Sequence, residues 1–112
     1  MIKIKTKVYI SGPITGTDMY MERFAIAEKE LAELGYIPIN PAKVNAQLPK
    51  ETSYEEYMKM SMLMLDMCDS IYMLRGWQKS FGANREYGYA LAMDKTILLE
   101  NKEITDESKS ND

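Results

Sequence analysis

The spacing of hydrophobic residues changes from a strand period to a helix period early in the chain. Ile2, Ile4, Val8 and Ile10 recur at even spacing, and residues 7–10 are predicted to form the first strand. Apolar residues then recur at intervals of three and four, which predicts one apolar helix face: Tyr20, Phe24, Ala27, Leu31 and Leu34. We expect Thr17 or Asp18 to cap this helix and Gly35 to end it.

The same change of period recurs along the rest of the chain. Residues 36–39 are a short apolar run that ends at Asn40-Pro41, and residues 42–52 are predicted to be a surface loop. Ser53 and Glu56 form a capping box that begins a helix extending to about residue 67. The remaining predicted elements are a strand at 69–74, a loop at 75–81, a helix at about 83–93 with Leu91 inward, and a strand at 96–99.

Strands and helices therefore alternate, which favours parallel strands joined by right-handed helical crossovers. We expect a single-domain Rossmann- or flavodoxin-like α/β fold. It is a three-layer sandwich with a sheet of four or five parallel strands and helices on both faces. The domain is expected at residues 1–100. Residues 101–112 are polar and have no hydrophobic period, so they are expected to form a disordered tail.

Composition excludes several function classes. The chain has one cysteine, Cys68, and no histidine, so we expect no intrachain disulfide and no metal site built on soft ligands. An oxygen-ligated magnesium ion stays an open alternative, although no paired-carboxylate cluster indicates one, and we expect no metal and no cofactor. The net charge is −3 and no basic stripe is present, which argues against a nucleic-acid polymer as partner. Residues 1–7 lack a signal-peptide hydrophobic region and no apolar run could span a membrane. A cytoplasmic protein without a membrane partner is expected.

Ligands of open parallel sheets bind beyond the carboxyl ends of the strands. Three segments are predicted to lie there, and they are rich in glycine, proline and small polar residues: 11–16, 40–41 and 75–82. Gly12 and Gly16 would let the backbone approach a ligand closely, with helix N–H groups behind them. They equally suit a tight turn between strand and helix.

Glu86 is the residue of this region with the clearest chemistry. Ser80 and Gly82 precede a predicted helix, whose free N–H groups can bind a phosphate or a carboxylate. Glu86 is expected in the first turn of that helix, where the dipole favours an ionised carboxylate suited to nucleophilic attack. In the alternative interpretation, Glu86 only stabilises its own helix N-terminus.

The predicted helix at 54–67 carries Tyr, Met and Leu residues on more than one face. Flexible methionine side chains fill gaps in cores and in subunit interfaces. One small core should not absorb all of these residues, so we expect a homo-oligomer (a dimer or larger) formed through this helix.

Four segments of the chain are sequence motifs that occur together, in this order, in a known protein family. They are residues 8–16, 35–41, 68–74 and the run Gly76-Trp77-x-x-Ser80-x-Gly82-Ala83-x-x-Glu86. In this order they resemble the DUF4406 family, a branch of the nucleoside 2-deoxyribosyltransferase-like superfamily, over residues 7–99.

The resemblance implies N-glycosidic chemistry on a nucleoside or nucleotide, by a deoxyribosyltransferase or a nucleotide N-glycosidase. In characterised relatives a Glu attacks the anomeric carbon, expels the base and forms a glycosyl-enzyme ester, which a second base or water resolves. Glu86 matches this nucleophile, and Tyr9 matches an aromatic residue near it. The substrate-binding residues that the resemblance implies are Ser11, Gly12, Ile14, Gly16, Asn40, Ser61, Gly76, Trp77, Ser80, Gly82 and Ala83.

Ser61 departs from the family pattern, because relatives usually carry an Asp at this position. A serine hydroxyl cannot act as a general acid near neutral pH. Asp66 is on the same predicted helix, but five residues further it points roughly 140° away. Three hypotheses stay open: an enzyme with Glu86 as nucleophile, a nucleotide-binding module with weak or no catalysis that serves as sensor or sponge, and an oligomeric scaffold.

Overall fold

The computed structural model describes residues 5–100, and the predicted tail at 101–112 lies outside them. Four strands alternate with helices: β1 (Lys7–Ser11), β2 (Ile37–Ile39), β3 (Ser70–Met73) and β4 (Thr96–Leu99). The helices are α1 (Tyr20–Glu33), α2 (Pro41–Asn45), α3 (Tyr54–Asp66), the 3₁₀ helix η1 (Trp77–Lys79) and α4 (Phe81–Ala92). No helix within residues 5–100 is long and apolar enough to cross a membrane.

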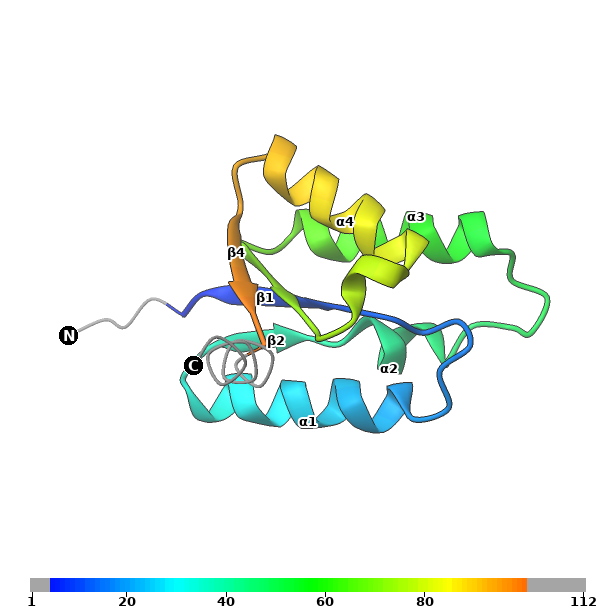
Figure 1. Ribbon diagram of the computed structural model, residues 1–112, viewed down its shortest axis with the longest axis horizontal. Helices are drawn as coiled ribbons and strands as arrows, with labels where there is room; N and C mark the ends of the chain where they lie inside the picture. Colours follow the sequence, from blue (N-terminus) through cyan, green and yellow to red (C-terminus); the bar gives the residue numbers. More distant parts are fainter. Residues whose placement is uncertain (1–4, 101–112) are drawn as a thin grey trace, which may run out of the picture.

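The strands form one parallel sheet in the order β2-β1-β3-β4. Helices α1 and α2 cover one face of the sheet, and α3 and α4 cover the other (Figure 1). The predicted three-layer α/β sandwich is thereby confirmed. Because β2 and β3 lie on opposite sides of β1, the chain leaves the sheet in opposite directions at that point, which creates a crevice at the carboxyl end of β1.

Alternation along β1 divides the core into two halves. Val8 and Ile10 are fully buried and pack against Phe24 and Leu31 of α1. Tyr9 points to the opposite face, into the half of the core that α3 and α4 cover. Each fully buried side chain of this size contributes about 1.5–3 kcal/mol through the hydrophobic effect. The same alternation places Ser11 on the Tyr9 side of the sheet.

The structure corrects the prediction of a loop at residues 42–52, because residues 41–45 form α2. The Asn40 side chain accepts a hydrogen bond from the Lys43 backbone N–H, and Pro41 takes the first position of the helix. Asparagine at the cap followed by proline starts a helix without an amphipathic period, so the hydrophobic pattern did not reveal α2.

Two further predictions about helices were wrong, whereas the capping box was right. Met19, and not Thr17 or Asp18, takes the N-cap position of α1, without a side-chain hydrogen bond. Leu91 is 53% exposed and does not face the core. Ser53 caps α3 as predicted, with both hydrogen bonds of the capping box present.

Candidate active site

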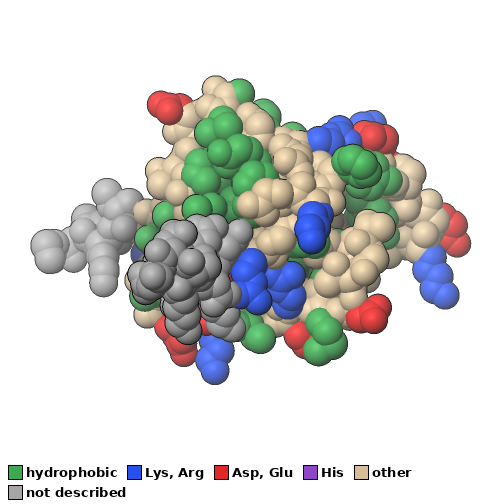
Figure 2. Space-filling view, viewed as in Figure 1, with side chains coloured by type: hydrophobic (Ala, Val, Ile, Leu, Met, Phe, Trp, Pro, Cys, Tyr) green, Lys and Arg blue, Asp and Glu red, His purple; other side chains and the backbone are tan. Residues whose placement is uncertain are grey.

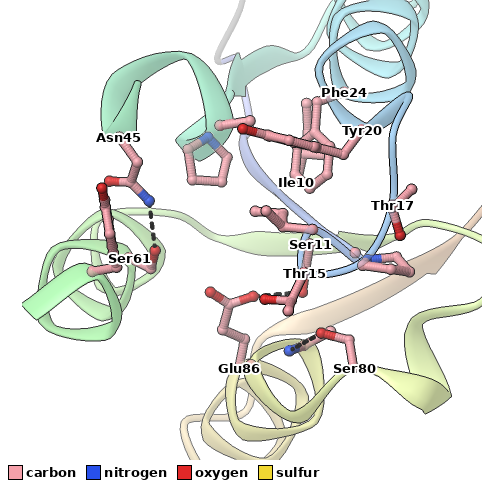
Figure 3. Close-up of a pocket in the computed structure, with 18 of the residues that line it drawn as sticks. Ile10, Ser11, Thr15, Thr17, Tyr20, Phe24, Asn45, Ser61, Ser80 and Glu86 are labelled. Atoms are coloured by element: carbon pink, nitrogen blue, oxygen red, sulfur yellow. Dashed lines mark hydrogen bonds between the residues drawn. The ribbon is translucent and has the colours of Figure 1, made fainter. Parts of the chain in front are cut away.

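A cavity of about 1020 Å³ opens beyond the carboxyl end of β1. Its walls come from β1, the loop that follows it, α1, α2, α3 and the segment from Arg75 to Glu86 (Figure 3). The volume suits a small organic ligand. The cavity lies where the topology of the sheet predicts a ligand, at the reversal of strand order.

Glu86 is only 6% exposed although it lines this cavity. Ser80 caps α4 by accepting a hydrogen bond from the Ala83 N–H at 3.1 Å, so the helix begins at Phe81, two residues earlier than predicted. Glu86 therefore lies in the second turn, beyond the reach of the helix dipole. This position corrects both sequence-based interpretations that placed Glu86 in the first turn.

Two hydroxyl groups of β1 hold the Glu86 carboxylate instead. The Tyr9 hydroxyl donates to Oε2 at 2.7 Å, and the Ser11 hydroxyl donates to Oε1 at 2.6 Å. Both donors reach the same carboxylate because residues two apart on a strand face the same side. Each carboxylate oxygen thus has one fixed donor and keeps one lone pair.

Burial and these donors act in opposite directions on the Glu86 carboxyl. Burial raises the pKa of Glu86 and the hydrogen bonds from Ser11 and Tyr9 lower it, and the net result is a rise from 4.5 to about 7. Burial, and then the neighbouring Glu86, raise the pKa of Tyr9 well above its ordinary value of 10.0. Near neutral pH the site therefore combines a partly ionised carboxylate with a protonated phenol.

The opposite wall carries a second polar pair. Asn45 at the end of α2 donates through Nδ2 to Ser61 Oγ on α3 at 3.3 Å (Figure 3). Ser61, on the same wall, lowers the pKa of Tyr9. Asn45 Oδ1 is buried and has no hydrogen-bond partner within residues 5–100. Sequence reasoning missed Asn45 because its segment was predicted to be a loop.

Basic side chains line the mouth of the cavity, which sequence reasoning also missed. Arg23, Lys50, Arg75 and Lys79 all contribute to its lining. The Arg23 guanidinium donates to the Arg75 carbonyl at 2.8 Å and lies 3.5 Å from the carboxylate of Glu100. Basic side chains also gather near the centre of the face shown in Figure 2. The four basic residues of the cavity lining are far apart in the sequence, so the sequence itself shows no basic stripe.

Most of the predicted site residues meet at this cavity, and three do not. Those that line it are Tyr9, Ser11, Gly12, Ile14, Ser61, Gly76, Ser80, Gly82, Ala83 and Glu86. Gly16 serves a turn with φ of +76°, and Asn40 caps α2 and donates to Glu28 at 3.0 Å. The Trp77 ring packs against Tyr87 with centroids 4.6 Å apart.

Gly12 has a packing role that its position in the first loop did not reveal. A Cβ at this residue would lie 2.8 Å from the Cβ of Leu74. The chain after β1 therefore needs a glycine to pass the fully buried Leu74. This close approach keeps the loop against the end of β3 and so shapes the edge of the cavity.

Fold and site together define a Rossmann-like α/β protein with a buried carboxylate at its ligand crevice. Residues 6–99 match the family model described as "Domain of unknown function (DUF4406)", and the chain belongs to this family. It is also similar to the solved 2-deoxyribosyltransferase from Bacillus psychrosaccharolyticus, with a TM-score of 0.68 and 20% identity. That likeness covers 83% of this chain and 70% of the other, and it confirms the fold. No curated protein matches the chain.

Proposed function

We propose that this protein cleaves or transfers the N-glycosidic bond of a nucleoside or nucleotide, with Glu86 as the nucleophile. The observation that carries the proposal is the buried Glu86 carboxylate, held at the cavity by the hydroxyls of Tyr9 and Ser11. The similar structure from Bacillus psychrosaccharolyticus is described as a biocatalyst for nucleoside synthesis, which supports this class of substrate.

The reaction would proceed in two displacement steps. One Glu86 oxygen attacks the anomeric carbon, the C–N bond breaks, and its electron pair leaves with the base nitrogen, giving a glycosyl ester. Water or a second base then attacks the same carbon and releases the carboxylate. The pKa of about 7 keeps a substantial fraction of Glu86 ionised at neutral pH, as the first step requires.

The departing base needs a proton, and this requirement supports a second candidate function. Glu86 is the only carboxylic acid among the described residues that line the cavity. Ser61 stands where relatives usually carry an Asp, and its hydroxyl is a poor acid. A nucleotide-binding module with weak or no catalysis is therefore the alternative proposal.

The basic mouth of the cavity supports a nucleotide more than an uncharged nucleoside. Arg23, Arg75 and Lys79 line the cavity together with Ser80 and Gly82 at the start of α4. Guanidinium groups and free N–H groups at a helix start both bind phosphate oxygens. The proposed substrate is accordingly a nucleoside monophosphate whose phosphate lies at this end of the cavity.

Self-association through α3 is part of the proposal. Tyr54, Leu63 and Met67 are 47%, 63% and 58% exposed on this helix and its C-cap. Apolar side chains as exposed as these favour association, because contact removes their surface from water. The proposed assembly is a homo-oligomer with α3 in its interface.

A panel of nucleosides and nucleoside monophosphates tests the function directly. Free base is measured by chromatography for the wild type, for Glu86→Gln, and for Glu51→Gln, which changes an exposed Glu outside the cavity. The enzymatic function is supported if Glu86→Gln abolishes base release and Glu51→Gln leaves it intact. Binding without release favours the binding module, and the absence of both overturns the proposal.

A further inference from the structure

We propose that Glu100 is a positioning residue that fixes the Arg23 guanidinium at the mouth of the cavity and so sets the preference for a phosphorylated ligand. Glu100 directly follows β4, and its side chain is only 13% exposed. The inference rests on the part of the proposed function that places a phosphate at this end of the cavity. It does not depend on whether the protein cleaves that ligand.

The sheet carries Glu100 to this place. Leu99 of β4 is paired with Met73 of β3, and the Glu100 N–H donates to the Met73 carbonyl at 3.1 Å. The chain thus follows β3 for one residue beyond β4, to the carboxyl edge of the sheet where a ligand is expected. From there the Glu100 carboxylate reaches the backbone of the segment that leaves β3.

Glu100, Arg75 and Arg23 form a closed triangle of contacts. Glu100 Oε1 accepts a hydrogen bond from the Arg75 N–H at 2.7 Å. The Arg75 carbonyl accepts one from Arg23 Nη2 at 2.8 Å, and the same nitrogen lies 3.5 Å from Glu100 Oε1. The three residues come from α1, the segment after β3 and the segment after β4, so the triangle ties three elements together.

The triangle leaves part of the Arg23 guanidinium for a ligand. Arg23 and Arg75 line the cavity, whereas Glu100 does not. Both contacts of Arg23 in the triangle use Nη2, and a guanidinium also carries N–H groups on Nη1 and Nε. Guanidinium groups bind phosphate oxygens through pairs of such N–H groups. Glu100 therefore acts on a ligand through its two partners and not by direct contact.

The expected benefit is a guanidinium that is ordered before the ligand arrives. A long arginine side chain loses conformational freedom when it binds an anion, and less is lost when the side chain is already held. Without the Glu100 carboxylate, Arg23 would keep only the Arg75 carbonyl, and the Arg75 N–H would lose its acceptor. The segment that carries this carbonyl would then be held less firmly, and the guanidinium with it.

Charge alone predicts the opposite effect. Glu100 is an anion near the proposed phosphate, so its removal would strengthen phosphate binding if only repulsion mattered. This repulsion is limited because the charge of Glu100 is paired with Arg23. Lys50 and Lys79 of the cavity lining are exposed, so the mouth is open to salt, which screens charges over about 8 Å at physiological ionic strength. We therefore expect the positioning effect to prevail, and the two effects differ in sign.

The test measures binding to the full chain by isothermal titration calorimetry. The probes are inorganic phosphate and the four common 2′-deoxynucleoside 5′-monophosphates, each monophosphate with its matching nucleoside. The measured quantity is the ratio of the dissociation constants of nucleoside and monophosphate. It is compared for the wild type, Glu100→Ala, Glu100→Gln, Arg23→Ala and the double variant of Arg23→Ala with Glu100→Ala. Glu30→Ala is the matched control, because it removes the same charge from an exposed position of α1 outside the cavity.

We expect Glu100→Ala to lower this ratio about five- to tenfold, the scale of a weakened charge-assisted hydrogen bond to phosphate, and to weaken the binding of inorganic phosphate in parallel. Glu100→Gln keeps an oxygen acceptor for the Arg75 N–H, so its effect should be smaller, about two- to threefold. Glu30→Ala should match the wild type. In the Arg23→Ala background, Glu100→Ala should have little further effect, because Glu100 acts through Arg23.

An unchanged or larger ratio in Glu100→Ala overturns the inference, and so does a full effect of Glu100→Ala in the Arg23→Ala background. Thermal melting shows whether each variant is folded. If Glu100→Ala does not fold, a ratio in Glu100→Gln at or above that of the wild type overturns the inference instead.

This inference and the proposed function fail separately. A wild type that binds the monophosphates no more tightly than the nucleosides overturns the role of Glu100, while base release still decides whether the protein is an enzyme. A wild type that releases no base, but whose phosphate preference falls in Glu100→Ala, supports the role of Glu100 in a binding module.

Discussion

The Ser11 hydroxyl donates to Glu86 Oε1 at 2.6 Å although the two residues are 75 positions apart in the chain. The contact exists because β1 pairs with β3 and α4 follows β3 on the face toward which Ser11 points. Tyr9, two residues earlier on β1, reaches the other carboxylate oxygen. The site therefore depends on the pairing of two strands, and no local segment could form it alone.

Burial of Glu86 predicts that stability falls as pH rises. Its pKa is raised from an ordinary 4.5 to about 7, so the folded chain binds more protons than the unfolded chain between these values. The contribution of Glu86 to the free energy of unfolding is fully present below pH 4.5 and is lost as pH rises through 7. Relative to Glu86→Gln, the wild type should lose roughly 2–4 kcal/mol across this window in urea unfolding experiments. If the free energy of unfolding changes with pH in the same way in the wild type and in Glu86→Gln, the raised pKa of Glu86 is contradicted.

Ser80→Ala should weaken the preference for a phosphorylated ligand. We expect a nucleoside monophosphate to raise the melting temperature of the wild type more than the matching nucleoside does. The substitution also removes the α4 cap, at a cost of about 1 kcal/mol, so the difference between the two ligands is compared within each protein. That difference should shrink in Ser80→Ala. Equal shifts from both ligands in the wild type would argue against a phosphate site.

Ser61→Asp should accelerate cleavage of the C–N bond. The introduced carboxyl would supply the proton that the departing base requires, and general acid catalysis contributes about 10²-fold or more. The gain should be largest for bases that leave poorly without protonation. Rates of base release are compared for the wild type, Ser61→Asp and Ser61→Thr. If neither the wild type nor Ser61→Asp releases base while binding is intact, the binding module is the better account.

Association through α3 predicts that the wild type sediments as a dimer or larger species at tens of micromolar. Leu63→Asp should shift it toward the monomer, because a charge would be buried in the apolar interface. Leu91→Asp is the matched control, since Leu91 is also exposed but lies on α4. A monomeric wild type, or equal effects of both substitutions, would contradict an interface at α3.

Features encoded locally in the sequence were predicted well. The alternation at residues 7–10, the capping box at Ser53 and the helical spacing after Tyr20 gave the element order and the parallel sheet. Element ends were less predictable. Ser80 starts α4 two residues early, and Asn40-Pro41 starts α2 without an apolar period.

The candidate site was predicted only where a motif marks it. Ser80 and Glu86 were found from their position at the start of a predicted helix and also match the family motif, whereas Tyr9 was found through the family resemblance alone. All three line the cavity. Asn45 and Arg23 were missed, since their roles depend on contacts between segments far apart in the chain. Hydrophobic spacing gives no information on such polar contacts, because they are fixed only when the layers pack.

The most direct test of the account is whether Glu86 becomes covalently attached to a sugar. The protein is mixed with a nucleoside monophosphate that it cleaves, quenched in acid, digested and measured by peptide mass spectrometry. We predict a mass increase equal to the sugar phosphate on the peptide that contains Glu86, and none in Glu86→Gln. Base release with no adduct, at a rate that Glu86→Gln leaves unchanged, would contradict the assignment of Glu86 as the nucleophile.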